Sequence, residues 1–204
     1  MPSPHVTSRT TDEELVILTL KERDYYEHLM QHYEAKLTRY IRRISGARRE
    51  DAQDILQEVF IKVYRNLNDF DGRLKFSSWI YRIAHNETVT HLRKITVRRI
   101  IHLDAHPALA QMLRSDFGVE EAIDREYLKK HLHKVINTLD EKYRVVLILY
   151  YEEGKNYQEM SDILQKPMAT IATLLRRAKE KLKKQIIKHY QLFNVYVQHF
   201  AKDT

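Results

Sequence analysis

The chain has 204 residues, 43% of them hydrophobic and 31% charged, and a formal net charge of +7. It contains no cysteine, which excludes disulfides, thiolate zinc sites and thiol catalysis and fits a reducing cytoplasm. No apolar run is long enough to cross a membrane, and residues 1–10 lack the apolar stretch of a secretory signal, so a cytoplasmic protein is expected.

Few residues of the chain favour tight turns, since it has only four glycines and four prolines. We expect an all-α fold of two small helical domains joined by a flexible linker. Residues 1–20 are expected to form an N-terminal tail that turns helical near its end. From Lys21 to about Ser45, apolar residues recur at intervals of three and four, which indicates an amphipathic helix that Gly46 ends. These apolar positions are Tyr26, Leu29, Tyr33, Leu37, Tyr40, Ile41 and Ile44.

Two further helices complete the first domain, which we expect over residues 21–97. They are predicted at residues 48–68 and 77–94, with a loop between them. Residues 98–124 have poor periodicity and change from basic to acidic along their length. We therefore expect a linker at 98–124.

The second domain, expected over residues 125–184, ends in a helix-turn-helix pattern. Helices at 126–139 and 141–153 precede a short helix at 157–164, a turn, and a longer helix that Thr170 is suited to cap. At about 100° per residue, the apolar residues of the longer helix share one face. They are Ile171, Leu174, Leu175, Ala178 and Leu182.

The opposite face of this last helix carries much of the positive charge of the protein. Residues 166–188 hold eight Lys or Arg and one acidic residue, Glu180. A solvated basic face is one explanation, but the turn and the short helix before it favour a helix that enters the DNA major groove. There, arginine recognises guanine, threonine contacts a thymine methyl, and lysines meet phosphates. The candidate residues are Thr170, Ala172, Thr173, Arg176, Arg177 and Lys179.

The predicted helix at 77–94 presents a different surface, suited to unpaired bases. Ser77 or Ser78 is a suitable N-cap. One stripe offers amide and guanidinium groups to bases or phosphates through Arg82, Asn86 and Arg93. Aromatic residues nearby are of the kind that stack on unpaired bases, although Trp79 is favoured as a core residue and Phe76 suits either place. These aromatic residues are Phe70, Phe76, Trp79 and Tyr81.

The preceding helix has an acidic polar face that would repel DNA. A solvated face is the usual explanation, but on a DNA-binding domain an acidic patch more plausibly faces a basic protein partner. The residues of this face are Asp51, Asp54, Gln57 and Glu58.

Two blocks of this sequence resemble the extracytoplasmic-function (ECF) sigma factors of bacterial RNA polymerase. DAQDILQEVF at 51–60 and FSSWIYRIAHN at 76–86 resemble their region 2, and the segment from LDEKYR at 139–144 to Arg176-Arg177-Ala178 resembles region 4. Both blocks occur in family order and spacing. The likeness covers about residues 25–95 and 125–184, roughly two thirds of the chain.

The resemblance implies a transcription initiation factor without enzymatic activity or cofactor. Its partners would be the β′ clamp helices and β flap of core polymerase, promoter DNA, and an anti-sigma factor. The acidic face, Asp51 included, would bind the clamp helices, and the groove-facing residues would recognise the −35 duplex. The residues that would meet the −10 single strand are Asp71, Arg73, Phe76, Ser77, Trp79, Tyr81, Arg82, Asn86 and Arg93.

Five positions depart from the family pattern, two of them Ala172 and Leu174, where the family often has basic residues. Ala169 stands where a glycine is common before the recognition helix, and Thr90 replaces a frequent Asp. Gln165 replaces the usual glycine of the turn, which costs about 1 kcal/mol if the backbone there is left-handed. Base preference at −35 is therefore not predictable from the family, whereas groove binding is.

Residues 185–204 lie beyond the resemblance and carry an apolar stripe with helical spacing. Either they form a last helix that packs on region 4, or they are a regulatory segment that hides region 4 or meets a partner. Two other classes of protein compete with the sigma factor. A helix-turn-helix regulator that is not a polymerase subunit leaves region 2 unexplained. An enzyme would need more than His28 and His32, whose spacing alone suits a metal, and no metal site is expected.

Overall fold

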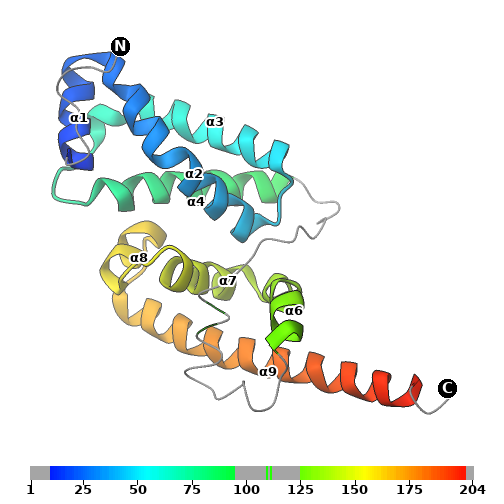
Figure 1. Cartoon of the computed structure of the whole chain (residues 1–204). Coiled ribbons are helices and arrows are strands. Elements are labelled where there is room, and N and C mark those ends of the chain that lie inside the picture. Colours follow the sequence, from blue (N-terminus) through cyan, green and yellow to red (C-terminus); the bar gives the residue numbers. More distant parts are fainter. Residues whose placement is uncertain (1–9, 95–108, 110, 112–124, 201–204) are drawn as a thin grey trace. The chain divides into compact units, whose positions relative to one another are not determined.

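The structure is a computed structural model that describes residues 10–94, 109, 111 and 125–200 (Figure 1). Throughout this part of the chain the regular secondary structure is helical, which confirms the all-α prediction. The contacts divide the elements into two compact units. One contains α1 to α4 together with α8, and the other contains α6, α7, η4 and α9. Apart from Leu109 and Gln111, the linker predicted at 98–124 lies outside the described residues.

The first unit is built around three long helices and a shorter one that precedes them. Counted along the chain with the short helix first, the first and third helices are each followed by a short 3₁₀ turn. The elements are α1 (Asp12–Lys21), η1 (Arg23–Tyr25), α2 (Tyr26–Ser45), α3 (Arg49–Arg65), η2 (Leu67–Asp69) and α4 (Phe76–Lys94). The predicted apolar stripe of α2 forms the core, since every one of its members except the half-buried Tyr26 is at most 1% exposed. Gly46 ends α2 with a φ of 67°, and its amide donates to the Arg42 carbonyl oxygen at 2.8 Å.

Helix α1 gives regular structure to the end of the segment expected as an N-terminal tail. Thr11 and Glu14 form a capping box: the Glu14 amide donates to Thr11 Oγ1 at 3.2 Å, and the Thr11 amide donates to Glu14 Oε2 at 2.8 Å. Leu15 and Val16 are 5% and 3% exposed. Because α1 buries these side chains and contacts α2, it belongs to the packed unit from Asp12 onward.

The second unit combines α6, α7 and the long helix α9. The elements are α6 (Arg125–Thr138), α7 (Glu141–Leu147), the π-helical turn η4 (Ile148–Glu152) and α9 (Met168–Phe200). Val146 and Leu147 of α7 and Ile171 and Leu182 of α9 are fully buried. The predicted apolar face of α9 therefore packs inward, against α6 and α7.

Helix α9 continues without a break from the predicted recognition helix into the C-terminal extension (Figure 1). It runs for 33 residues, and Ile186 in the extension is fully buried. The His189 and His131 rings lie 5.3 Å apart, which joins the extension to α6. Of the two explanations for residues 185–204, the structure favours a packed helix for the residues up to His189.

Candidate nucleic-acid interface

The outer face of α9 has the exposure that groove binding requires. Thr170, Ala172, Thr173, Arg176 and Arg177 are all exposed, and Lys179 is partly exposed. The prediction that Thr170 caps this helix is wrong. Helix α9 begins two residues earlier, at Met168, and the Thr170 amide donates to the Pro167 carbonyl oxygen at 2.9 Å.

Several side chains on this outer face already have intramolecular partners. The Thr173 hydroxyl donates to the Ala169 carbonyl oxygen at 2.9 Å, so its methyl group is the part left to contact a base. Arg176 Nη1 lies 2.6 Å from Glu180 Oε1 in an exposed ion pair. Lys179 Nζ lies 5.2 Å from the centroid of the Tyr151 ring. These contacts orient the side chains but leave them at the surface.

The turn before α9 has a left-handed backbone at Gln165, which meets the condition under which its replacement of glycine costs free energy. Its φ is 54°, and it is the one non-glycine residue with a positive φ in the described chain. The Gln165 side-chain amide donates to the Asp162 carbonyl oxygen at 3.2 Å. The Ser161 hydroxyl donates to the Lys166 carbonyl oxygen at 2.6 Å. Side-chain hydrogen bonds thus support a conformation that glycine adopts more easily.

Helix α4 presents the polar stripe predicted for unpaired bases. Asn86 and Arg93 are exposed, and Arg82 is half-buried. The loop before α4 is closed by its own contacts: the Arg73 guanidinium binds Asp71 at 2.7–3.0 Å, and the Leu74 amide donates to the Asp71 carbonyl oxygen at 2.9 Å. The hydrogen bonds from Arg73 lower the pKa of Asp71 to about 2. The loop therefore holds a fixed pair of opposite charges at the surface.

The aromatic residues proposed as stacking platforms belong instead to the core. Phe76, Trp79 and Tyr81 are 0%, 6% and 3% exposed. Phe76 packs against Tyr33, Phe70 and Trp79 with ring centroids 5.4–5.7 Å apart. The core position favoured for Trp79 is thus confirmed, and of the two places left open for Phe76 the structure shows the core. The platform interpretation is wrong for Tyr81, whose ring is also buried. Phe70 keeps a partly exposed surface.

The expected N-cap of α4 is also wrong. The helix starts at Phe76, so Ser77 and Ser78 occupy its second and third positions. Ser78 is 1% exposed, and its hydroxyl has no hydrogen-bond partner among the described residues. The Phe76 amide donates instead to Glu13 Oε1 of α1, at 3.0 Å.

The acidic face of α3 forms one wall of a cleft whose other wall is α4. Asp54, Gln57 and Glu58 are exposed and line a space of about 490 Å³. Lys62 crosses from α3 to α4 and binds Glu87 at 2.5 Å. The sequence did not indicate the contribution of α4, which consists of Glu87, Thr90, His91 and Lys94. Their spacing of three and four along one helix was the available signal.

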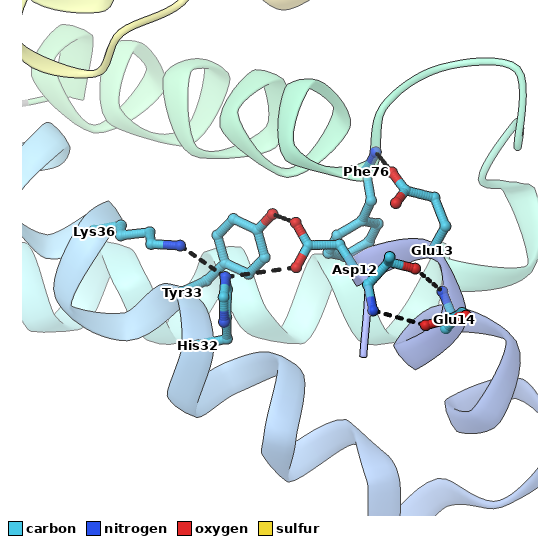
Figure 2. Close-up of polar contacts among 8 residues, drawn as sticks. Asp12, Glu13, Glu14, His32, Tyr33, Lys36 and Phe76 are labelled. Carbon is cyan, nitrogen blue, oxygen red and sulfur yellow. Dashed lines mark hydrogen bonds and ion pairs between the residues drawn. The ribbon is translucent and has the colours of Figure 1, made fainter. Parts of the chain in front are cut away.

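A network of polar contacts fastens α1 to α2 and α4 (Figure 2). The Tyr33 hydroxyl donates to Asp12, and burial followed by this hydrogen bond raises the pKa of Tyr33. Asp12 also lies 3.5 Å from His32 Nε2, which is 2.7 Å from Lys36 Nζ. The Nε2 atom of His32 thus already contacts both Asp12 and Lys36. In the described chain no group of three or more His, Cys, Asp or Glu is arranged to hold a metal ion.

Comparison with known proteins identifies both halves of the chain. Residues 29–98 match the family model of sigma-70 region 2, and residues 130–182 match that of sigma-70 region 4. The ECF RNA polymerase sigma factor SigW of Bacillus subtilis is 33% identical over 172 residues, which cover 81% of this chain and 90% of SigW. The chain belongs to the ECF sigma factors.

Two solved structures share the fold of this sigma factor. CnrH, solved in complex with the cytosolic domain of CnrY, has a TM-score of 0.62 at 18% identity over 85% of this chain and 95% of its own. RpoE of Bartonella quintana, solved with the anti-sigma factor NepR, has a TM-score of 0.59 and is 20% identical. The match covers 79% of this chain and 96% of the RpoE chain. In this sigma factor α3 and α4 lie within the region 2 match, and α7, α8 and the first half of α9 within the region 4 match. None of its described helices combines the length and apolar character needed to cross a bilayer.

Proposed function

We propose that this ECF sigma factor joins core RNA polymerase and directs initiation at promoters that carry both a −35 and a −10 element. The observation that carries this proposal is the presence of both sigma regions in one chain, each with an exposed polar or basic surface. A helix-turn-helix regulator needs only the region 4 part, so it leaves the region 2 match without a role.

The −35 duplex is the proposed ligand of the outer face of α9. Thr170, Ala172 and Thr173 stand near the start of the helix, where such helices approach base edges. Arg176 and Arg177 can donate to guanine or to phosphates, and Lys179 to phosphates. Lys183 and Lys184 continue the basic surface, so binding should weaken steeply with salt.

The −10 single strand is the proposed ligand of α4 and the loop before it. Asp71, Arg73 and Ser77 surround the start of the helix, and Arg82, Asn86 and Arg93 extend along it. Phe76, Trp79 and Tyr81 support this surface from the core and do not themselves stack on bases. Extruding a base costs a few kcal/mol, so melting would draw on the binding energy of the other contacts.

Core polymerase is the proposed partner of the cleft between α3 and α4. Asp54 and Glu58 make its α3 side acidic beside Gln57, and Glu87 adds a carboxylate from α4. Asp51, in the first turn of α3, extends the acidic face beyond the cleft. A basic surface on the β′ clamp helices would complement these charges. Region 4 would rest on the β flap. Polymerase supplies the chemistry, so we assign no catalytic residue to the sigma factor and place its work in the cytoplasm, with the chromosome.

An anti-sigma factor is a further proposed partner. CnrH was solved with the cytosolic domain of CnrY, and RpoE with the anti-sigma factor NepR. An antagonist of this chain would act by covering the α4 or α9 surface, the two surfaces that promoter binding requires.

Transcription in vitro with bacterial core polymerase and a randomised promoter library tests the proposal directly. We expect specific start sites preceded by paired −35 and −10 elements only when the protein is present. A matched control is the double variant Asp54→Asn with Glu58→Gln, which keeps both DNA-binding surfaces but removes two charges from the proposed polymerase face. Binding to duplex without initiation by the wild-type protein would contradict the proposal and favour a simple regulator.

A further inference from the structure

Helix α1 supplies a hydrogen-bond acceptor to the first residue of α4. The Phe76 amide donates to Glu13 Oε1 at 3.0 Å, although the two residues are 63 positions apart (Figure 2). The residue before Phe76 is Lys75, whose side chain has no acceptor with which to cap a helix. Glu13 therefore takes the place of a local N-cap, and its carboxylate lies at the positive end of the α4 dipole.

Glu13 is held in position because its neighbour Asp12 is fastened to α2. Asp12 accepts the Tyr33 hydroxyl and lies 3.5 Å from His32 Nε2. The Tyr33 ring in turn packs edge-on against the Phe76 ring, with centroids 5.7 Å apart. The amide of Phe76 is thus fixed by α1, and its side chain by α2.

The loop that ends at Phe76 is therefore restrained both near its tip and at its end. Near its tip, Asp71 binds the Arg73 guanidinium and accepts the Arg73 amide at 3.0 Å. At its end, the Lys75 carbonyl oxygen accepts hydrogen bonds from the amides of Ser78 and Trp79. The amide of Phe76, the residue after Lys75, donates to Glu13. Loss of the Glu13 contact would leave the first amide of α4 without its acceptor and allow the helix start to fray.

We propose that Glu13 is a positioning residue for promoter opening, which fixes the start of α4 and thereby the loop at residues 70–75 that meets the −10 single strand. The inference rests on the proposed function, because it concerns the −10 surface described there. Glu13 acts through the backbone of Phe76 and is not itself a DNA contact.

The test uses the full chain assembled with bacterial core polymerase. The probe is a fluorescent single-stranded oligonucleotide that carries the −10 element selected by the wild-type protein from the promoter library. Glu13→Ala removes the acceptor, whereas Glu13→Gln keeps an oxygen that can accept the Phe76 amide. Glu22→Gln is the matched control, since Glu22 is an exposed carboxylate at the other end of α1.

We expect Glu13→Ala to weaken oligonucleotide binding about tenfold, the effect of losing one hydrogen bond to a charged group. Glu13→Gln should fall between Glu13→Ala and the wild type, and Glu22→Gln should match the wild type. Binding to core polymerase and to a −35 duplex should not change. Permanganate reactivity of thymines in the −10 element should fall in the same order as oligonucleotide affinity.

Two results would overturn the inference alone. One is equal oligonucleotide affinity for Glu13→Ala and the wild type. The other is a loss of core polymerase binding in Glu13→Ala as large as its loss of oligonucleotide binding, since a residue that only stabilises the fold would affect both. A wild-type holoenzyme that opens no promoter would instead overturn the proposed function, and this inference with it.

Discussion

The two helices that carry the proposed DNA-binding surfaces are held in different ways. Helix α4 is braced by other elements: Glu13 of α1 binds its first amide, and Lys62 of α3 binds Glu87. His85 of α4 also lies 3.2 Å from the Tyr40 hydroxyl of α2. The start, middle and inner face of α4 are therefore each fastened to a different neighbouring helix.

The recognition part of α9 packs its inner face against α6 and α7, but the side chains of its outer face are held by contacts within the helix. Thr173 bonds to Ala169 and Arg176 to Glu180, each one turn away. Such pairs hold side chains without adding elements that would block a groove. The comparison teaches that the two surfaces proposed to bind DNA are supported differently, by polar contacts from neighbouring helices in α4 and by pairs within the helix on the outer face of α9.

The largest test of this comparison removes the ring behind the −10 surface. Phe76→Ala should destabilise the first unit by about 3–5 kcal/mol, because Phe76 is fully buried among aromatic rings. Trp79 is the only tryptophan of the chain and lies in this unit, so its fluorescence during urea unfolding measures the loss. Leu175→Ala in α9 is the control and should shift the far-UV transition of the second unit more than the Trp79 signal. If Phe76→Ala and Leu175→Ala shifted the Trp79 fluorescence transition equally, the expected difference between the two variants would be contradicted.

A second test concerns the contact between α4 and α2. Burial lowers the pKa of His85 from its usual 6.5 to about 4. Below pH 6.5 the unfolded chain takes up a proton that the folded unit accepts only near pH 4, so stability falls as the pH falls through this window. At pH 5 the loss should be about 2 kcal/mol relative to pH 7.5. Urea unfolding followed at Trp79 measures it, and His85→Gln should lack this component; an unchanged pH dependence in His85→Gln would contradict the assignment.

A smaller effect is expected in the turn before α9. Gln165→Gly should stabilise the protein by about 1 kcal/mol, because glycine adopts the observed φ of 54° without strain. Thermal unfolding measures this change. Asp162→Gly is a suitable comparison, since that residue is within α8 and glycine should destabilise it by about 1 kcal/mol. Destabilisation by Gln165→Gly would mean that the Gln165 side-chain hydrogen bond outweighs the backbone strain.

The smallest expected effect tests the local pair on α9. Glu180→Gln should strengthen −35 binding by the holoenzyme about twofold, because it releases Arg176 and the exposed pair contributes only about 0.3–0.5 kcal/mol. Repeating the substitution in an Arg176→Ala background separates this release from the general loss of a negative charge. An identical gain in both backgrounds would show that the pair does not restrain Arg176.

Local signals predicted most of the secondary structure. The three-and-four spacing predicted α2 and the inner face of α9, and Gly46 ends α2 with a positive φ as expected. The capping box Thr11-x-x-Glu14 was also visible and could have extended the first domain to α1. In each case the signal lies within a few residues of the structure that it specifies.

The misses depend on contacts between distant residues. Phe76 is aromatic in either environment, and only its packing on Tyr33 decides that it is core. A serine before a helix is a good cap only if the helix starts after it, and the acceptor from Glu13 lets α4 start at Phe76. The cleft beside α3 likewise needs side chains of α4, whose three-and-four spacing places them on one face of α4 but does not show that this face lies next to α3.

The length of α9 has a mechanical consequence. At 1.5 Å per residue, a helix of 33 residues is about 50 Å long, and its first turns carry the groove-facing side chains. Because α9 is one continuous helix, its last residues lie several turns beyond the residues proposed to contact the −35 duplex. A rotation of α9 about its own axis, applied near Phe200, would therefore also rotate Arg176 and Arg177.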